Sequence, residues 1–189
     1  MKNDSEFIDA FKSDVIHNMT MSLARNGGLD PMINILAKNI VEKELNVIIV
    51  PVPRGALENN DTKEVFAEII PTLFDEMYKR GFEPLCYSWS SEAWLRKGDK
   101  DKGVPEDWQE LPKIEVLMTT FETKDSSIMD IHTIKREGKM ADENGELIDC
   151  ISLEKDPELN MADGKVEGRF GSVFKTYMKK KEKNETSNT

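Results

Sequence analysis

The sequence predicts an α+β protein in which a mainly antiparallel sheet of about five or six strands carries a long helix on one face. Apolar residues between Thr62 and Arg80 recur in doublets four positions apart, which is the pattern of an amphipathic helix. After Gly81 the chain changes to short apolar and β-branched runs separated by turn residues, which predict strands. Helices that separate groups of consecutive strands favour an antiparallel sheet.

The chain begins with a predicted amphipathic helix over residues 5–24. Its apolar residues recur at spacings of three and four, so they share one face of the helix. Gly27 and Gly28 follow, and glycine readily adopts the left-handed conformation that commonly ends a helix. The helix is therefore expected to end just before this pair.

Two strands are predicted next, over 32–37 and 46–52, with a charged hairpin loop between them. A short helix over 32–44 is the competing interpretation. The second strand is β-branched and nearly continuous in apolar residues, which is typical of a strand buried on both faces. Pro51 and Pro53 cannot donate to a ladder, so they mark the end of this strand or a sheet edge.

The long helix is predicted to begin at Asp61 or Thr62 and contains Pro71. An interior proline removes one backbone hydrogen bond and costs about 3 kcal/mol. Because the apolar doublets continue in phase on both sides of Pro71, we predict one kinked helix rather than two helices. We assign the doublets to the core; they are Val65-Phe66, Ile69-Ile70, Leu73-Phe74 and Met77-Tyr78.

The second half of the chain is predicted to consist mainly of strands. The segments are 85–95, 114–123, 128–136 and 147–153. A short polar turn after Thr123 makes the second and third of these an antiparallel hairpin. Asn144 and Gly145, just before the last strand, form the strongest two-residue turn signal in the chain. A final helix is predicted over 170–180.

These elements predict one domain over 1–155, made of the N-terminal helix at 5–24 and a core at 28–155, followed by a polar extension over 156–189 that holds a short helix and a disordered tail. The order α-ββ-α-βββ(β)-α is similar to the topology of the roadblock, longin and profilin group, in which a five-stranded sheet carries helices on its faces. A shared topology does not imply a shared function.

Composition excludes several functional classes. The net charge of −10 argues against nucleic-acid or anionic-membrane binding, which depends on clustered Lys and Arg. The one basic cluster, near Lys180, is interpreted as a solvated helix end. No apolar run approaches the roughly 18 residues of a membrane span, and the first residues lack a signal peptide. We expect a cytoplasmic protein in which Cys86 and Cys150 are buried free thiols.

No strong catalytic, phosphate-binding or metal-binding motif occurs, so no cofactor or metal is predicted. The first weak catalytic candidate is Glu92, an acid in an apolar and aromatic strand that follows Tyr87. A carboxylate in such a place can act as a general base. The favoured alternative is a solvated acid, or one paired with Arg96 or Lys113.

The second weak candidate combines Cys86, His132 and Cys150, which fall on three different predicted strands. A thiol and an imidazole can form a nucleophilic pair, and two thiolates with an imidazole can hold zinc. No sequence-local spacing supports either arrangement. Core cysteines and a surface histidine are therefore the favoured interpretation.

Three residues are candidates for an interaction surface. Trp94 lies on the opposite strand face from Trp89, so one of the two is expected to be exposed. Trp108 stands in an acidic loop, where a large aromatic side chain often packs on the core or anchors a partner. Arg54 follows the proline-rich end of a strand and could clamp a carboxylate or a phosphate.

Four short segments resemble a loose set of uncharacterised small proteins from bacteriophages and bacteria. They are Gly28-Leu-Asp-Pro-Met, Val50-Pro-Val-Pro, Ser91-Glu-Ala-Trp and Glu115-Val-Leu-Met. The resemblance extends over 28–137, about three fifths of the chain. It implies a phage or mobile-element origin, and it transfers no site residue because those proteins have no established activity.

The leading functional hypothesis is a non-enzymatic accessory or interaction protein with a protein partner, in which Trp94 or Trp108 lies in an exposed apolar patch. A small hydrolase that uses Glu92, or Cys86 with His132, is the first alternative. A structural component of a virion is the second.

Overall fold

The computed structural model describes residues 4–53, 60–96, 107–155 and 172–187. Its elements are α1 (Asp4–Asn26), β1 (Met32–Asn39), β2 (Leu45–Pro51), α2 (Asn60–Lys79), β3 (Phe82–Arg96), the short 3-10 helix η2 (Trp108–Glu110), β4 (Lys113–Glu122), β5 (Ser127–Ala141), β6 (Leu147–Lys155) and α3 (Val173–Ser187). The α+β class and the predicted order of elements are confirmed. The competing helix over 32–44 is wrong, since this stretch holds β1 and a hairpin loop.

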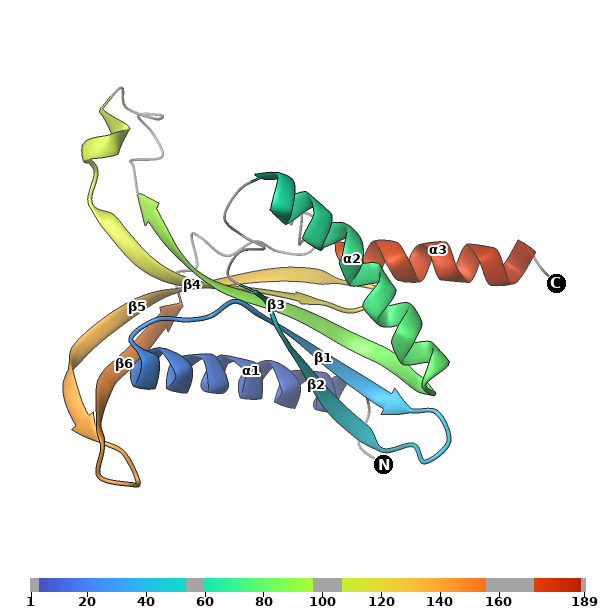
Figure 1. The fold of residues 1–189 in the computed structure, drawn as a ribbon, viewed down its shortest axis with the longest axis horizontal. Coiled ribbons are helices and arrows are strands. Elements are labelled where there is room, and N and C mark those ends of the chain that lie inside the picture. Colours follow the sequence, from blue (N-terminus) through green and yellow to red (C-terminus); the bar gives the residue numbers. More distant parts are fainter. Residues whose placement is uncertain (1–3, 54–59, 97–106, 156–171, 188–189) are drawn as a thin grey trace.

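The six strands form one antiparallel sheet in the order β2-β1-β3-β4-β5-β6. β1 lies between β2 and β3, and its residues 33–37 are buried because helices cover both faces of the sheet there. β2 and β6 are the edge strands. Figure 1 shows that the sheet is strongly curled, with the far ends of β3 and β4 turned away from β5 and β6.

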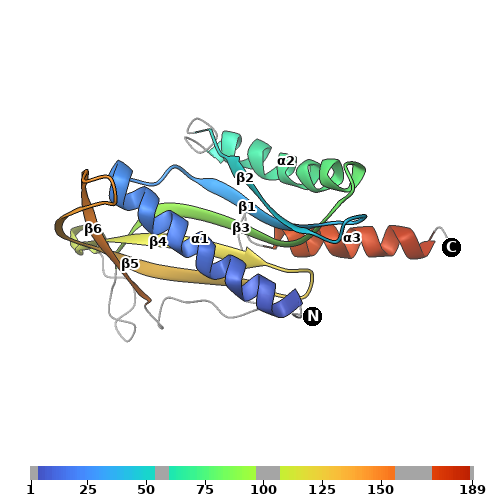
Figure 2. The same cartoon turned by 90° about the horizontal axis from the view of Figure 1, so that it is seen from below.

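Helices cover both faces of the sheet, and each covered face has its own core (Figures 1 and 2). We call the faces the α1 face and the α2 face. On the α1 face the helix α1 packs on buried side chains of four strands, which are Leu36, Cys86, Leu117, Phe121 and Ile134. On the α2 face the helices α2 and α3 pack on Ile33, Ile35, Ala37, Tyr87 and Trp89.

A glycine ends α1, as the sequence predicts. The amide of Gly27 donates to the carbonyl oxygen of Leu23, and Gly27 has a φ of 70°. A side chain is disfavoured at this φ, which is why glycine suits the position. Helix α2 continues through Pro71 without interruption, so one helix forms rather than two, and its kink stays a prediction.

The C-terminal helix α3 is held on the sheet by a buried carboxylate of β4. Glu122 accepts hydrogen bonds from the amides of Val173, Phe174 and Lys175, at 3.2, 2.8 and 3.2 Å. These are amides of the first helical turn, which have no acceptor within the helix. Burial raises the pKa of Glu122, although the backbone hydrogen bonds oppose this shift. Beyond its first turns α3 extends past the sheet (Figure 1).

The predicted burial of the second strand is wrong. β2 is an edge strand whose side chains alternate between partly buried and exposed, because only β1 pairs with it among the described strands. The inference from Pro51 is right, since β2 ends there and lies at the sheet edge. The assignment of all α2 doublets to the core is also wrong, because Val65 and Ile69 are exposed.

Candidate interaction surface at the sheet edge

The sheet separates the residues of the predicted thiol and zinc sites. Glu92, Leu117 and His132 lie opposite one another across β3, β4 and β5, whereas Cys86 is six residues from Glu92 along β3. At about 3.3 Å per residue this offset is about 20 Å. Cys150 and Ile151 are neighbours on β6, so their side chains point to opposite faces of the sheet. Ile151 packs on the α1-face core, to which Cys86 belongs, and Cys150 therefore faces away from Cys86.

The two cysteines and the histidine therefore have separate environments. Cys86 is fully buried, and burial raises the pKa of its thiol to about 12, so it is not a thiolate at neutral pH. Cys150 is a free cysteine that is only partly buried, which corrects the prediction of two buried thiols. Burial also lowers the pKa of His132. The described residues include no group of three potential metal ligands.

Glu92 lies on the α1 face and has a structural partner. Its Oε2 atom accepts a hydrogen bond from the backbone amide of Leu29 at 3.1 Å. This contact fixes the loop that connects α1 to β1. The sequence predicts Arg96 or Lys113 as the partner of Glu92, and the partner found here is the Leu29 amide. Arg96 instead donates to the carbonyl oxygen of Leu111.

An arginine close to Glu92 joins three other parts of the molecule. The guanidinium of Arg136 donates to Glu115 at 3.2 Å, to Asp149 at 3.2 Å and to the carbonyl oxygen of Gly27 at 3.1 Å. It thereby links β4, β5 and β6 to the C-terminal end of α1. The Glu115 carboxylate is the main cause of the raised pKa of Arg136. These charges position elements rather than a reacting group.

Of the predicted interaction residues, the structure places Trp94. Its side chain is 59% exposed and lies on the part of β3 that continues past β1 and pairs with β4 alone. Trp89, on the opposite face, is buried, so the predicted difference between the two is confirmed. The side chain of Trp108 and all of Arg54 lie outside the described residues.

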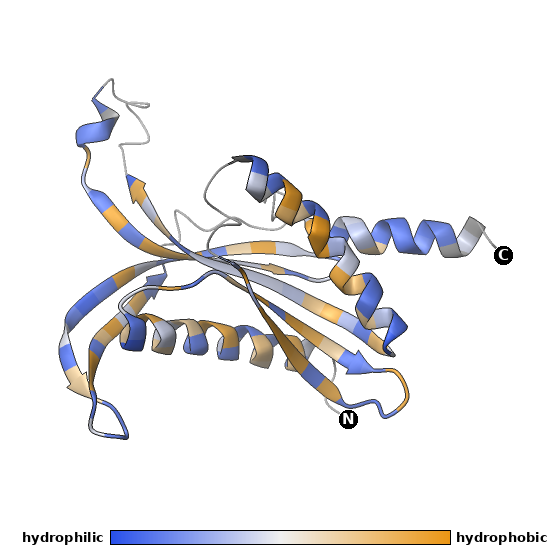
Figure 3. Ribbon diagram, in the orientation of Figure 1, coloured by the Kyte–Doolittle hydropathy of each residue, from blue (hydrophilic) through white to orange (hydrophobic). Residues whose placement is uncertain are grey.

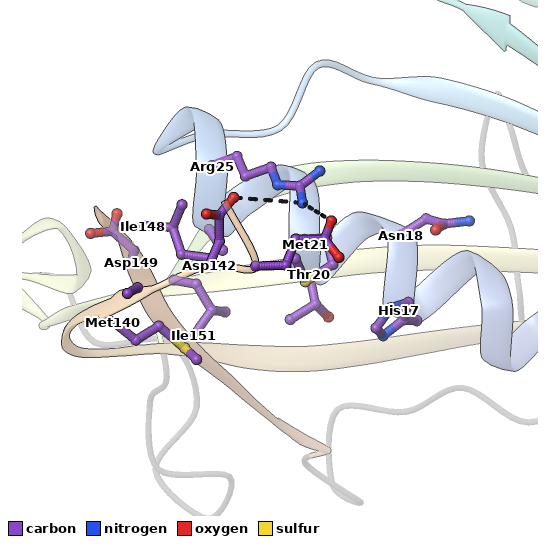
Figure 4. Close-up of a pocket in the computed structure, with 13 residues that line it drawn as sticks. His17, Asn18, Thr20, Met21, Arg25, Met140, Asp142, Ile148, Asp149 and Ile151 are labelled. Carbon is purple, nitrogen blue, oxygen red and sulfur yellow. Dashed lines mark ion pairs between the residues drawn. The ribbon is translucent and has the colours of Figure 1, made fainter. Parts of the chain in front are cut away.

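A cleft of about 540 Å³ lies between the C-terminal half of α1 and the β5–β6 hairpin (Figure 4). Met21, Met140, Ile148 and Ile151 give it apolar walls. Arg25 lies at 3.9 Å from Asp142 and at 3.6 Å from Glu143, which joins the helix to the hairpin loop. Asp149 pairs with Lys139 at 2.6 Å.

The charged groups of this cleft already have partners within the chain. A small-molecule site usually combines an apolar pocket with a few polar groups that converge on the ligand. Here the three carboxylates form ion pairs with Arg25, Arg136 and Lys139. The cleft therefore fits a joint between α1 and the hairpin better than a catalytic pocket.

The outer edge of β2 is the most unusual surface among the described residues. The stretch from Leu45 to Pro53 contains no charged residue. Val47 and Ile49 are 52% and 55% exposed on the α1 face. Figure 3 shows β2 as a largely hydrophobic strand at the margin of the sheet. Edge strands of monomeric proteins usually carry charges, prolines or bulges that prevent pairing with another chain. β2 has a proline only at its last residue, Pro51, and its pairing with β1 shows no register shift.

On its other face β2 borders an apolar crevice beneath α2. The crevice holds about 350 Å³ and is lined by Ile35, Ile48, Val50, Leu73, Met77 and Phe82, with Glu76 and Arg80 beside them. Ile69 and Val65 follow Leu73 at intervals of four towards the N-terminal end of α2, so they share its side of the helix. They are 46% and 58% exposed.

Among the described residues, no strand pairs with the outer edge of β2, which forms one surface with this side of α2. We call it the edge groove, defined by Val47, Ile48, Ile49 and Val50 of β2 and by Val65, Ile69 and Leu73 of α2. An added strand would pair with the backbone of β2 and bury these side chains on both of its faces. The sequence held a signal for the edge groove. Two apolar residues per turn give α2 an apolar face that is wider than the sheet covers, so part of that face is left exposed.

No protein-family model, no curated protein and no solved structure matches the chain. The topological likeness to the roadblock, longin and profilin group therefore stays a prediction. Among the described residues, no helix is long and apolar enough to span a membrane.

Proposed function

We propose that this protein is a phage-encoded, non-enzymatic interaction protein of the cytoplasm that binds another polypeptide along the edge groove. The observation that carries the proposal is the uncharged β2 edge, with Val47 and Ile49 more than half exposed beside an apolar crevice. The phage origin rests on the resemblance of the four short segments described above.

The edge groove supports binding by strand addition. An extended polypeptide gains affinity from main-chain hydrogen bonds to an edge strand and gains specificity from side chains that alternate between the two faces. Here one face would meet Val47 and Ile49, and the other would meet the crevice beneath Leu73. Each Å² of apolar surface covered contributes about 25 cal/mol before the costs of association.

The chemistry of the remaining candidates supports an enzyme less well. Among the described residues, Cys86 and His132 are about 20 Å apart along the strands, which is too far for proton transfer between them. Glu92 accepts a hydrogen bond from a backbone amide and lines neither described pocket. Trp94 is a second candidate anchor for a protein partner, on a different part of the sheet.

The test is a capture experiment in which the only change is a charge on the edge groove. Immobilised wild-type protein is incubated with a bacterial lysate that also contains an untagged copy of this chain. We expect Ile49→Lys to abolish capture of a polypeptide that the wild type retains, because an edge lysine disfavours strand pairing. Mass spectrometry identifies the captured polypeptide.

The matched control is Leu147→Lys. Leu147 is 74% exposed and lies on β6, the edge strand at the other end of the sheet. This variant carries the same new charge and should retain capture. Equal capture by the wild type and both variants, or no capture by any of them, would contradict the proposal.

A further inference from the structure

We infer that the polypeptide bound in the edge groove is β2 of a second copy of this chain. The protein would then be a two-fold symmetric dimer in which the two sheets join into one. This inference rests on the proposed function, because it names the occupant of the same surface.

The side-chain pattern of β2 is complementary to itself. Residues directly opposite each other in an antiparallel pair lie on the same face of the sheet. With a two-fold axis at Ile48, Val47 of each copy lies opposite Ile49 of the other. Both residues belong to the α1 face, where each is more than half exposed in the single chain. Pairing therefore buries four β-branched side chains together, and such pairs stabilise sheets.

The α2 face of the same interface is also complementary. Ile48 lies opposite its own copy there, at the margin of the crevice formed with Leu73 and Met77. The symmetry places both α2 helices on one face of the joined sheet and antiparallel to each other. The crevice of each copy, lined by Ile48, Leu73 and Met77, then lies beside the joint between the two sheets.

The choice of a second copy does not depend on charge attraction between the α2 helices. Exposed acids occur in both halves of α2, at Asp61 and Glu68 and at Asp75 and Glu76, and Lys79 already pairs with Glu76 at 2.6 Å. β2 itself contributes no like charges that would repel its copy, although each chain has a net charge of −10. Dimerisation should therefore strengthen as salt screens the net repulsion.

Size-exclusion chromatography with multi-angle light scattering tests the dimer. The wild-type chain, of 21.6 kDa, should elute with twice that mass at high concentration and dissociate on dilution. Ile49→Lys should have the mass of one chain over the same range, while Leu147→Lys should behave as the wild type. Circular dichroism of both variants establishes that each remains folded.

Hydrogen exchange gives a second measurement that does not depend on mass. Amides of β2 should exchange more slowly in the wild type than in Ile49→Lys, whereas amides of β6 should exchange equally in the two proteins. A wild type that is monomeric at every concentration would overturn the dimer, as would a dimer that survives Ile49→Lys. If the dimer is overturned in this way but the wild type captures a host protein that Ile49→Lys does not capture, the proposed function is still supported.

Discussion

β1 and β2 are the two strands of one hairpin, and both are rich in apolar residues, yet their environments are opposite. Ile33 and Ile35 of β1 are completely buried. Ile49 of β2, which lies opposite Asn34 of β1, is 55% exposed. The difference arises because β3 pairs with the outer side of β1, whereas no described strand pairs with the outer side of β2.

An apolar strand sequence therefore indicates that the strand needs to be buried, but it does not indicate which other segment buries it. β1 satisfies the requirement within its own chain, through the packing of α1, α2 and β3. β2 satisfies only part of it, and the proposed second copy would satisfy the rest. The expected effects of substitutions differ accordingly, and we give them from the largest to the smallest.

The largest effect should come from Ile33→Ala, because Ile33 is buried in the α2-face core. Removing buried methyl groups leaves a cavity and lowers the free energy of unfolding by about 2–5 kcal/mol. Ile49→Ala, the same change on the neighbouring strand, should cost less than about 1 kcal/mol in the monomer. Urea denaturation at low protein concentration measures both, since dimerisation adds concentration-dependent stability. Equal costs would remove the distinction between β1 and β2.

A smaller effect is expected from Glu122→Ala on the interior strand β4. The substitution leaves the amides of Val173, Phe174 and Lys175 without their carboxylate acceptor, at a cost of about 1–3 kcal/mol. Urea denaturation at several pH values measures it. Exposed acids at the sheet edge, such as Glu44, should give much smaller effects on substitution.

The pH dependence of this cost has a definite sign. Burial raises the folded-state pKa of Glu122 above its ordinary value of 4.5. The stability that Glu122 gains from this shift is therefore complete below pH 4.5 and is lost as the pH rises through the raised pKa. The stability difference between the wild type and Glu122→Ala should be larger at pH 5 than at pH 8. A difference that grows with pH would contradict a raised pKa.

The smallest effect concerns labelling of the two thiols, which leaves the fold intact. Cys86 is on the interior strand β3, and its pKa of about 12 keeps it protonated at pH 8. Cys150 is on the edge strand β6 and is only partly buried. A thiol reagent should therefore modify one cysteine rapidly in native protein and both in denaturant. Cys150→Ser should abolish the rapid phase and Cys86→Ser should retain it; two rapid phases in the wild type would be inconsistent with this assignment.

The candidate site was only partly predictable from the sequence. The opposite faces of Trp89 and Trp94 followed from strand alternation, which depends on local geometry alone, whereas the structure decides that Trp94 is the exposed one. The exposure of Val47 and Ile49 was missed, because an edge strand and a central strand can have the same apolar composition. Glu122 and Arg136 were missed because each contacts a segment more than 50 residues away along the chain, the start of α3 for Glu122 and the end of α1 for Arg136.

The sequence by itself determined the elements of this protein, including the end of α1 at Gly27, the continuity of α2 through Pro71 and the alternating faces of β3. Helical and strand periodicities, turn residues and caps are local properties, so they can be read along the chain. Only the tertiary structure decided the strand order, the separation of Cys86 from His132 and the exposure of Val47 and Ile49 on β2. Strand pairing depends on contacts between distant segments, and an apolar run does not specify which neighbour will cover it.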